Sequence, residues 1–246
     1  MRFKNDVAII TGAASGMGLL TAQNLCNEGA IAVLTDTNRD AVEASAEDIR
    51  RAGGQAMGLQ VDVRCYDQVE KAVAAVLAKY QRVDMMLNFA GGAETRVRHR
   101  HEPFHELPIE VIDWGLDVNL KGAVYFCRAV LGTMIRQKRG VIINLGSVTG
   151  VEGSAYAVNY SAAKSGLIGL TKSLALCGAP HGVRACCVSP GPVLTRPEMA
   201  NMKTRLGRAA EPQEIVDLIL YLCSDKAAFI TGSNYMIDGG RTCGGI

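Results

Sequence analysis

The sequence predicts an α/β protein with a doubly wound, mostly parallel sheet of about seven strands and helices on both faces. Short β-branched runs alternate with longer amphipathic stretches from one end to the other. A glycine cluster stands where the first strand would turn into the first helix. No internal repeat and no linker divides the 246 residues, so we expect one domain over residues 1–246.

The predicted strands are short and rich in β-branched residues. In order they are Val7–Thr11, Ile31–Thr35, Met57–Val61, Val83–Leu87, Val141–Leu145, Val183–Val188 and Tyr235–Ile237. The longer stretches between them are predicted as helices. These are Met17–Glu28, Arg39–Ala52, Tyr66–Tyr80, Ile109–Gln137, Tyr160–Gly178 and Pro212–Ser224.

Local signals end the first two helices. Gly29 follows the first helix where a left-handed C-cap is favoured, and Gly53-Gly54 follow the basic end Arg50-Arg51 of the second. The segment Gly91–Pro108 breaks the rhythm because it is long, polar and basic. Such a segment inside a compact domain is usually functional or mobile.

Composition excludes several classes of protein. Lys plus Arg number 26 and Asp plus Glu 24, a balance that argues against general nucleic-acid binding. The eight cysteines include no C-x-x-C pair, which favours a reducing compartment without disulfides or structural zinc. No apolar run approaches a membrane span or a secretory signal, so we expect a cytoplasmic protein.

The glycine cluster is a candidate phosphate site. Gly12, Gly16 and Gly18, with Ser15 and Met17 between them, let backbone N–H groups approach a pyrophosphate at a helix N-terminus. An ordinary strand-to-helix turn is the alternative.

Asp36 ends the second predicted strand. There it would accept hydrogen bonds from an adenosine ribose and repel a 2′-phosphate. The alternative is a helix N-cap.

These residues resemble the short-chain dehydrogenase/reductase family in its single-domain form, from Asp6 to Gly240. The resemblance implies a Rossmann-type fold that binds NAD. It places an adenine contact at Asp62-Val63 and departs from the family's N-N-A-G at Phe89, which we expect to alter packing beside the cofactor without abolishing binding. The remaining implied cofactor residues are Asn88, Ala90, Gly91, Pro190, Gly191, Val193 and Thr195.

Tyr160 and Lys164 are the most specific feature, since positions i and i+4 share one helix face. An exposed helical pair is the alternative, but Ser147 precedes Tyr160 by 13 residues and Asn119 lies in the long predicted helix. The resemblance implies that Tyr160 is the general acid/base and that Ser147 orients the substrate oxygen. Lys164 would bind the nicotinamide ribose and lower the pKa of Tyr160, which also contacts the cofactor, while Asn119 would position a water.

The predicted function is therefore an NAD-dependent oxidoreductase that interconverts a secondary alcohol and a ketone, without a metal. Rivals are a 3-oxoacyl-carrier-protein reductase using NADPH and a non-catalytic dinucleotide sensor or scaffold. Asp36 opposes the first rival, and the intact set of catalytic residues opposes the second.

Partners and substrate are predicted less directly. The histidine cluster His99, His101 and His105 is interpreted as part of a solvated loop and not as a metal site. A broad apolar arc over Leu167–Leu176 predicts a homotetramer or dimer. The arginines of the basic segment either meet an anionic small-molecule substrate or lie in solvent; they are Arg96, Arg98 and Arg100.

Overall fold

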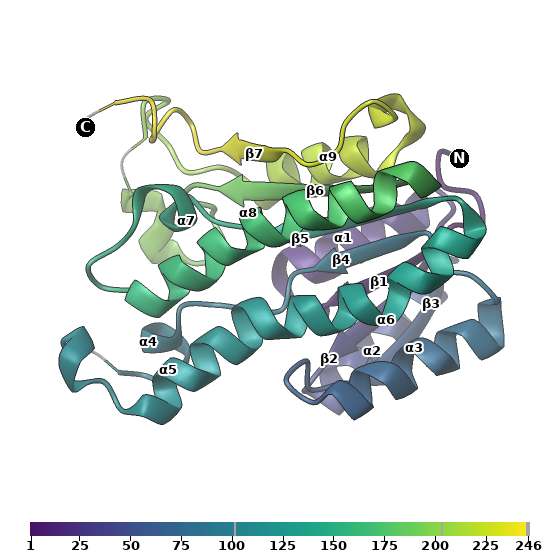
Figure 1. Ribbon diagram of the computed structural model, residues 1–246, viewed down its shortest axis with the longest axis horizontal. Coiled ribbons are helices and arrows are strands. Elements are labelled where there is room, and N and C mark those ends of the chain that lie inside the picture. Colours follow the sequence, from purple (N-terminus) through teal and green to yellow (C-terminus); the bar gives the residue numbers. More distant parts are fainter. Residues whose placement is uncertain (101, 203, 245–246) are drawn as a thin grey trace.

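The computed structural model describes residues 1–100, 102–202 and 204–244, and it confirms the predicted fold class (Figure 1). One seven-stranded parallel sheet has the order β3-β2-β1-β4-β5-β6-β7. Its strands are β1 Val7–Thr11, β2 Ile31–Asp36, β3 Gln55–Gln60, β4 Met85–Asn88, β5 Gly140–Leu145, β6 Val183–Pro190 and β7 Asn234–Ile237. From β1 the chain adds strands first on one side and then, from β4 onward, on the other. Ligands bind at this switch point, between β1 and β4, in sheets of this kind.

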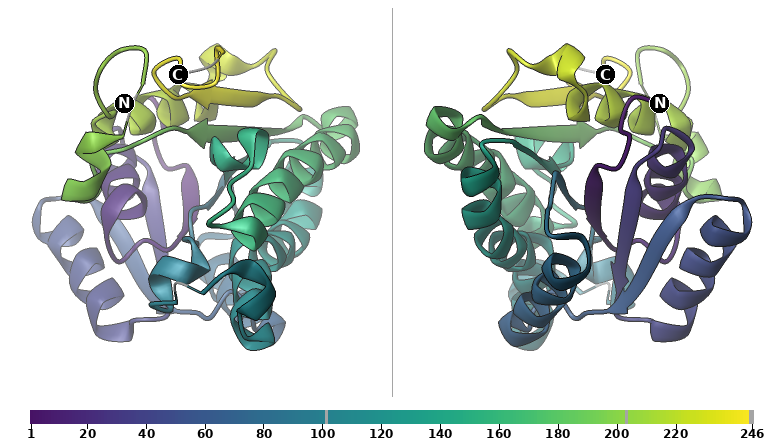
Figure 2. Two further views of the ribbon diagram at one scale, coloured as in Figure 1. Left: turned by 90° about the vertical axis from the view of Figure 1, so that its left-hand side faces the viewer. Right: turned by 90° about the vertical axis from the view of Figure 1, so that its right-hand side faces the viewer.

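Helices cover both faces of the sheet (Figure 2). On one side lie α1 Gly16–Asn27, α2 Arg39–Arg51 and α9 Pro212–Cys223, and on the other lie α3 Tyr66–Tyr80, α6 Gly122–Gln137 and α8 Val158–Gly178. None of the described helices is long and apolar enough to cross a membrane.

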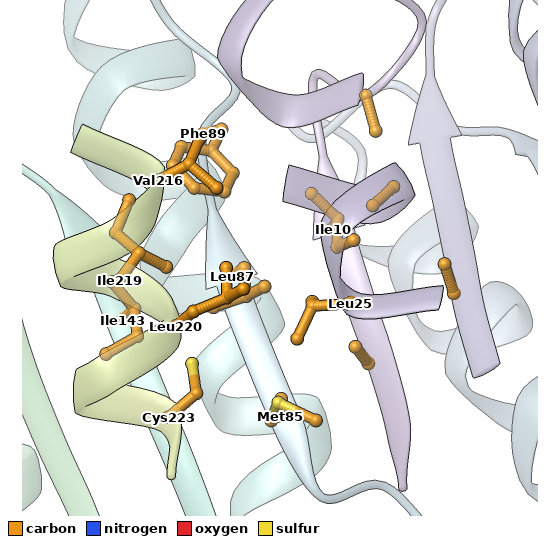
Figure 3. Close-up of a cluster of buried hydrophobic side chains, with 14 of the residues drawn as sticks. Ile10, Leu25, Met85, Leu87, Phe89, Ile143, Val216, Ile219, Leu220 and Cys223 are labelled. Carbon is orange, nitrogen blue, oxygen red and sulfur yellow. The ribbon is translucent and has the colours of Figure 1, made fainter. Parts of the chain in front are cut away.

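Two hydrophobic clusters follow from the alternation of side chains along the strands. In β1, Ala8 and Ile10 belong to the cluster under α1 and α9, while Val7 and Ile9 belong to the cluster under α3 and α6. Figure 3 shows part of the first cluster, with Ile10, Leu87 and Phe89 from the sheet side and Val216 and Ile219 from α9. Because both faces are buried, the strands read as continuous apolar runs.

Strand positions were predicted correctly, but some ends differ. The fourth strand begins at Met85 instead of Val83, because the N–H of Val83 donates to Gln137 Oε1 at 3.0 Å and its carbonyl accepts from Gln137 Nε2 at 2.8 Å. The Gln137 side chain therefore pairs with the Val83 backbone where a neighbouring strand would otherwise do so. The third strand begins and ends slightly earlier than the predicted Met57–Val61.

The long predicted helix Ile109–Gln137 is divided. α5 Ile109–Leu116 and α6 are joined by a π-helical turn, Asp117–Lys121, which contains Asn119. Such turns are frequent at functional sites. The segment Gly91–Pro108, predicted as a loop, contains the one-turn helix α4 Glu94–Val97, and another such helix, α7 Thr149–Glu152, follows β5. Both are too short to show a hydrophobic period.

Candidate active site

The turn between β1 and α1 brings backbone very close to backbone. Gly12 has φ +63°, and a Cβ there would lie 2.9 Å from Ala90 Cα. A Cβ at Gly18 would lie 2.5 Å from the carbonyl oxygen of Gly12. The turn therefore requires glycine, and it leaves the N-terminus of α1 facing the carboxyl edge of the sheet, where the N-cap residue Ser15 makes no side-chain capping bond. This cradle fits the pyrophosphate of a dinucleotide.

A cavity of about 470 Å³ opens beside this turn. Asp36 lies in its wall, and its carboxylate accepts from the N–H of Ala14 at 3.3 Å and from the N–H of Asn38 at 3.1 Å. The predicted residues that line this cavity are Gly12, Ser15, Asp36, Asp62, Val63, Ala90 and Gly91. The cavity thus joins the phosphate turn to the residues expected at the adenosine.

Asp62 is held by a neighbour that the sequence did not single out. Arg64 donates to both carboxylate oxygens of Asp62, with Nη2 at 2.6 Å from Oδ2. This hydrogen-bonded guanidinium lowers the pKa of Asp62. The Asp62 carboxylate is therefore fixed and ionised beside the cavity.

A second cavity, of about 340 Å³, holds the predicted chemical residues. Its lining residues come from segments at the carboxyl edge of the sheet, which lies on the left of Figure 1 with α4 and α7. The predicted residues that line it are Met17, Gly91, Ser147, Tyr160, Lys164, Pro190, Gly191, Val193 and Thr195. Phe89 and Gly91 line both cavities, so the two meet at the turn after β4.

Tyr160 lies deep in this second cavity beside Ser147. Burial raises the pKa of the Tyr160 hydroxyl, whereas a hydrogen bond with Ser147 and the charges of Arg96 and Arg196 lower it. Ser147 is itself oriented by Thr149, whose hydroxyl donates to Ser147 Oγ at 3.0 Å. The two hydroxyls converge where a substrate oxygen would be held.

Lys164 is almost completely buried, with 3% of its surface exposed. Its Nζ donates to the carbonyl of Leu145 at 2.6 Å and lies 5.5 Å from the centre of the Tyr160 ring. Burial lowers the pKa of Lys164 to about 8. Arg96 and Arg196 are thus two cations whose charges lower the pKa of Tyr160. The same effect of Lys164, which the resemblance implies, stays a prediction.

Asn119 reaches the site through the backbone of the loop that follows β4. Its Oδ1 accepts from the N–H of Gly92 at 2.9 Å, and its Nδ2 donates to the carbonyls of Gly92 at 3.0 Å and Gly115 at 2.9 Å. A Cβ at Gly91 would lie 2.5 Å from Asn119 Oδ1 and 3.5 Å from Lys164 Nζ. Asn119 therefore fixes the loop directly beside Lys164.

Other predicted residues do not reach either cavity. The Asn88 side chain instead donates to Asn144 Oδ1 at 2.9 Å inside the sheet, and Asn144 donates to Thr171 Oγ1 at 2.9 Å, which joins β4, β5 and α8. Gly16 and Gly18 line neither cavity, although Gly18 packs against the carbonyl of Gly12 within the turn. Neither Arg98 nor Arg100 lines the second cavity, and Arg100 pairs with Glu102.

Sequence reasoning missed several residues of the site. Thr11 Oγ1 accepts from the N–H groups of Phe89 and Ala90, both at 3.0 Å, and so ties the two strand ends together; a Thr at the end of the first strand was the available signal. Arg196 lines the second cavity from a loop without any periodic pattern.

Glu94 was also missed, and it is buried behind the site. Its exposed fraction is 0%, and neither carboxylate oxygen has a hydrogen-bond partner. Burial raises the pKa of Glu94. His101 lies outside the described residues; among the rest no group of three or more His, Cys, Asp or Glu side chains could hold a metal ion.

Comparisons with known proteins agree with this geometry. A family model described as enoyl-(acyl carrier protein) reductase matches residues 12–242. Meso-2,3-butanediol dehydrogenase of Serratia marcescens is 36% identical, with 98% of this chain and 96% of that protein covered. The 3-oxoacyl-[acyl-carrier-protein] reductase FabG of Thermotoga maritima is 34% identical, with 98% and 99% covered. The crystal structure of gox2181 is similar at a TM-score of 0.90 and 30% identity, with 99% of this chain and 98% of that one covered.

Proposed function

The chain belongs to the short-chain dehydrogenase/reductase family, and we propose that it is an NAD-dependent oxidoreductase that interconverts a secondary alcohol and a ketone. Membership implies a nicotinamide dinucleotide cofactor and makes the chain an alcohol dehydrogenase or ketoreductase. The observation that carries the proposal is the convergence of Ser147, Tyr160 and Lys164 in one cavity that adjoins the glycine cradle.

Each side chain has a distinct part in the proposed reaction. Ser147 donates a hydrogen bond that orients the substrate oxygen, and Tyr160 exchanges a proton with that oxygen. The cofactor supplies the site that accepts or donates the hydride. Lys164 would contact the nicotinamide ribose, and Asn119 holds the Gly91-Gly92 backbone against Lys164. Pro190, Gly191, Val193 and Thr195 line the same cavity and would hold the nicotinamide.

Proton exchange at Tyr160 depends on the charges around it. The hydroxyl is buried, which opposes ionisation, but Ser147, Arg96 and Arg196 favour the tyrosinate. Burial prevails, so the pKa of Tyr160 lies above its ordinary value, which suits an acid in ketone reduction. Ser147 and the two arginines lower the cost of forming the tyrosinate that alcohol oxidation requires.

Asp36 supports a preference for NAD over NADP. Its carboxylate lines the first cavity with Gly12 and Ser15, where it would accept from ribose hydroxyls and repel a 2′-phosphate. A 3-oxoacyl-carrier-protein reductase using NADPH is the second candidate, favoured by the 34% identity to FabG of Thermotoga maritima.

An assay of nicotinamide absorbance tests the proposal. Sugar acids, polyols, hydroxysteroids and 3-oxoacyl thioesters are offered with NAD(H) and NADP(H) in turn. Turnover with NAD(H) that depends on Tyr160 supports the proposal, and turnover confined to thioesters with NADPH supports the second candidate. Tight dinucleotide binding without turnover of any substrate would favour a non-catalytic sensor or scaffold.

We further propose that residues 1–246 act as one catalytic domain within a homotetramer or dimer in the cytoplasm. Of the apolar arc on α8, Leu167 and Leu174 are buried inside the described chain, while Leu176 is 79% exposed. Only the outer part of the arc is therefore available to a second subunit. Light scattering of the wild type and of Leu176→Asp tests this, with a smaller particle expected for the variant.

A further inference from the structure

The cavity that holds Tyr160 has an uneven distribution of charge. Among the described residues that line it, four are basic and none is acidic. The basic residues are Arg96, Lys164, Arg196 and Arg241. A neutral alcohol substrate would leave these positive charges without a negative counter-charge.

Two of these cations already have partners. Lys164 donates to the carbonyl of Leu145, and Arg241 forms a forked pair with Glu152, with Nη2 at 2.7 Å and Nε at 3.0 Å from Oε1. Glu152 thus neutralises the charge of Arg241, and the Lys164 ammonium is hydrogen-bonded within the protein.

The other two cations, Arg96 and Arg196, have no such close partner among the described residues. Within the part of the chain that the structure describes, no carboxylate lies within 4.0 Å of the Arg96 guanidinium. The nearest carboxylate oxygen to Arg196 belongs to the exposed Glu198 at 3.9 Å, and Arg196 Nη2 instead contacts Met199 Sδ at 3.2 Å. Both guanidinium groups keep donors free for a ligand.

Arg96 and Arg196 also act on each other and on Tyr160. Burial and, to a smaller extent, the charge of Arg196 lower the pKa of Arg96, and the charges of both guanidinium groups lower the pKa of Tyr160. Both arginines line the same cavity of about 340 Å³ as the reacting hydroxyl of Tyr160. Two like charges at one site repel, and a bound anion would remove that repulsion.

The cofactor's pyrophosphate does not explain the pair. The glycine turn and Ser15 line the first cavity, whereas Arg96 and Arg196 line only the second. Arg96 comes from α4 and Arg196 from the segment after β6, both at the carboxyl edge of the sheet that faces the viewer in the left view of Figure 2. The pair thus belongs to the substrate side.

We propose that Arg96 and Arg196 bind an anionic group, carboxylate or phosphoryl, on a compact hydroxy or oxo acid whose carbinol or carbonyl carbon lies at Ser147 and Tyr160. The planar fork of arginine suits both groups. The cavity of about 340 Å³ must also admit the nicotinamide, which limits the substrate to a few carbons. This inference rests on the proposed function.

The first test compares substrates that differ only in charge. Initial rates with NAD are measured for 3-hydroxybutanoate, its methyl ester and 3-hydroxybutyl phosphate, in the wild type, Arg96→Gln, Arg196→Gln and the control Arg98→Gln. Arg98 is exposed, follows α4 directly and does not line the cavity. The ratio of kcat/KM between the acid and the ester cancels any effect of the variants on Tyr160.

We expect the wild type to prefer an anionic substrate over the ester, and each cavity variant to lower that ratio about 10-fold to 100-fold. Arg98→Gln should leave the ratio unchanged. Preference for the phosphate ester over the acid would identify the anion as phosphoryl. An equal rate for the neutral ester, or a ratio that neither variant changes, overturns the inference.

A second test does not depend on the carbon skeleton. Malonate and inorganic phosphate are titrated into the complex of enzyme and NADH and followed by calorimetry. Binding that Arg96→Gln and Arg196→Gln weaken about 10-fold supports the proposal, whereas absence of binding by both anions overturns it. If Arg96→Gln weakens NADH as much as the anion, the arginine serves the cofactor and the inference also fails. Failure of the wild type to bind NADH would instead overturn the proposed function.

Discussion

Asn119 and Gly92 hold each other through both polar atoms of one side-chain amide. Asn119 Oδ1 accepts from the Gly92 N–H at 2.9 Å, while Asn119 Nδ2 donates to the Gly92 carbonyl at 3.0 Å. The pair joins the π-helical turn to the loop that leads into α4. A helix irregularity thereby fixes the backbone beside Lys164 and the position of Arg96.

Asn119→Ala should therefore lower the free energy of unfolding by about 2–4 kcal/mol, because it leaves buried backbone groups of Gly92 and Gly115 unpaired. Urea unfolding measures the change. Asn27→Ala, at an exposed position at the end of α1, is the matched control. A loss as small as that of the control would show that the amide pair contributes little.

Tyr160→Phe should retain NADH binding and lose about 100-fold or more in turnover, since only the proton-exchanging hydroxyl is removed. Tyr156→Phe makes the same change four residues earlier, in the turn before α8, where the residue is 91% exposed, and should be neutral. Fluorescence titration of NADH and steady-state rates separate binding from chemistry. Near-normal turnover in Tyr160→Phe would refute the assignment.

Asp36→Ala should reduce the preference for NAD over NADP about 10-fold or more, because it removes the charge that repels the 2′-phosphate. The ratio of the two dissociation constants is the measurement. Asp48→Ala, an exposed carboxylate on α2, controls for a general change in charge. Tighter binding of NADP than of NAD by the wild type would contradict the proposal.

Lys164→Met should remove a pH dependence of stability. Unfolded lysine holds its proton up to a pKa of 10.5, whereas buried Lys164 releases it above about pH 8, so the unfolded state binds more protons between these values. The stability of the wild type relative to Lys164→Met should therefore rise by about 3 kcal/mol from pH 8 to 10.5.

Urea unfolding at several pH values measures this difference. Lys172→Met changes an exposed lysine on the same helix and should follow the wild type. Parallel curves for the wild type and Lys164→Met would mean that burial does not disfavour the Lys164 ammonium.

Glu94→Gln should stabilise the protein at pH 7. Burial without hydrogen-bond partners raises the pKa of Glu94, so the folded state binds a proton more tightly than the unfolded state. The stability that this carboxyl contributes is present below its unfolded pKa and is lost as pH rises through the folded pKa. The advantage of Glu94→Gln should therefore shrink as pH falls towards 4, and an advantage independent of pH would contradict this explanation.

The sheet could be predicted because its signals are local. Continuous apolar runs such as Val141–Leu145, and glycines at the turns, indicate the strands without any tertiary information. The start of β4 could not be predicted, because it depends on Gln137, which lies 54 residues away from Val83. The π-helical turn interrupts a helix whose hydrophobic pattern continues through it.

In the candidate site, too, local spacing was predictable from the sequence and tertiary neighbours were not. The spacing of Tyr160 and Lys164 predicted a shared face, and the structure has both in one cavity. Arg196 lies in a segment with no period or motif, so only the folded chain reveals that it lines the same cavity as Arg96. The hydrogen-bond partner of Lys164 could not be predicted from the sequence either, because it is the backbone carbonyl of Leu145 in β5.

Phe89 and Gly91 form the wall shared by the two cavities. A dinucleotide that spans this wall binds as two tethered fragments, so its second half meets its cavity at an effective concentration set by the pyrophosphate link. AMP and nicotinamide mononucleotide offered separately would each lack that advantage. The affinity of the intact molecule should therefore exceed that of either fragment by about 100-fold or more, without any contact that the fragments do not make themselves.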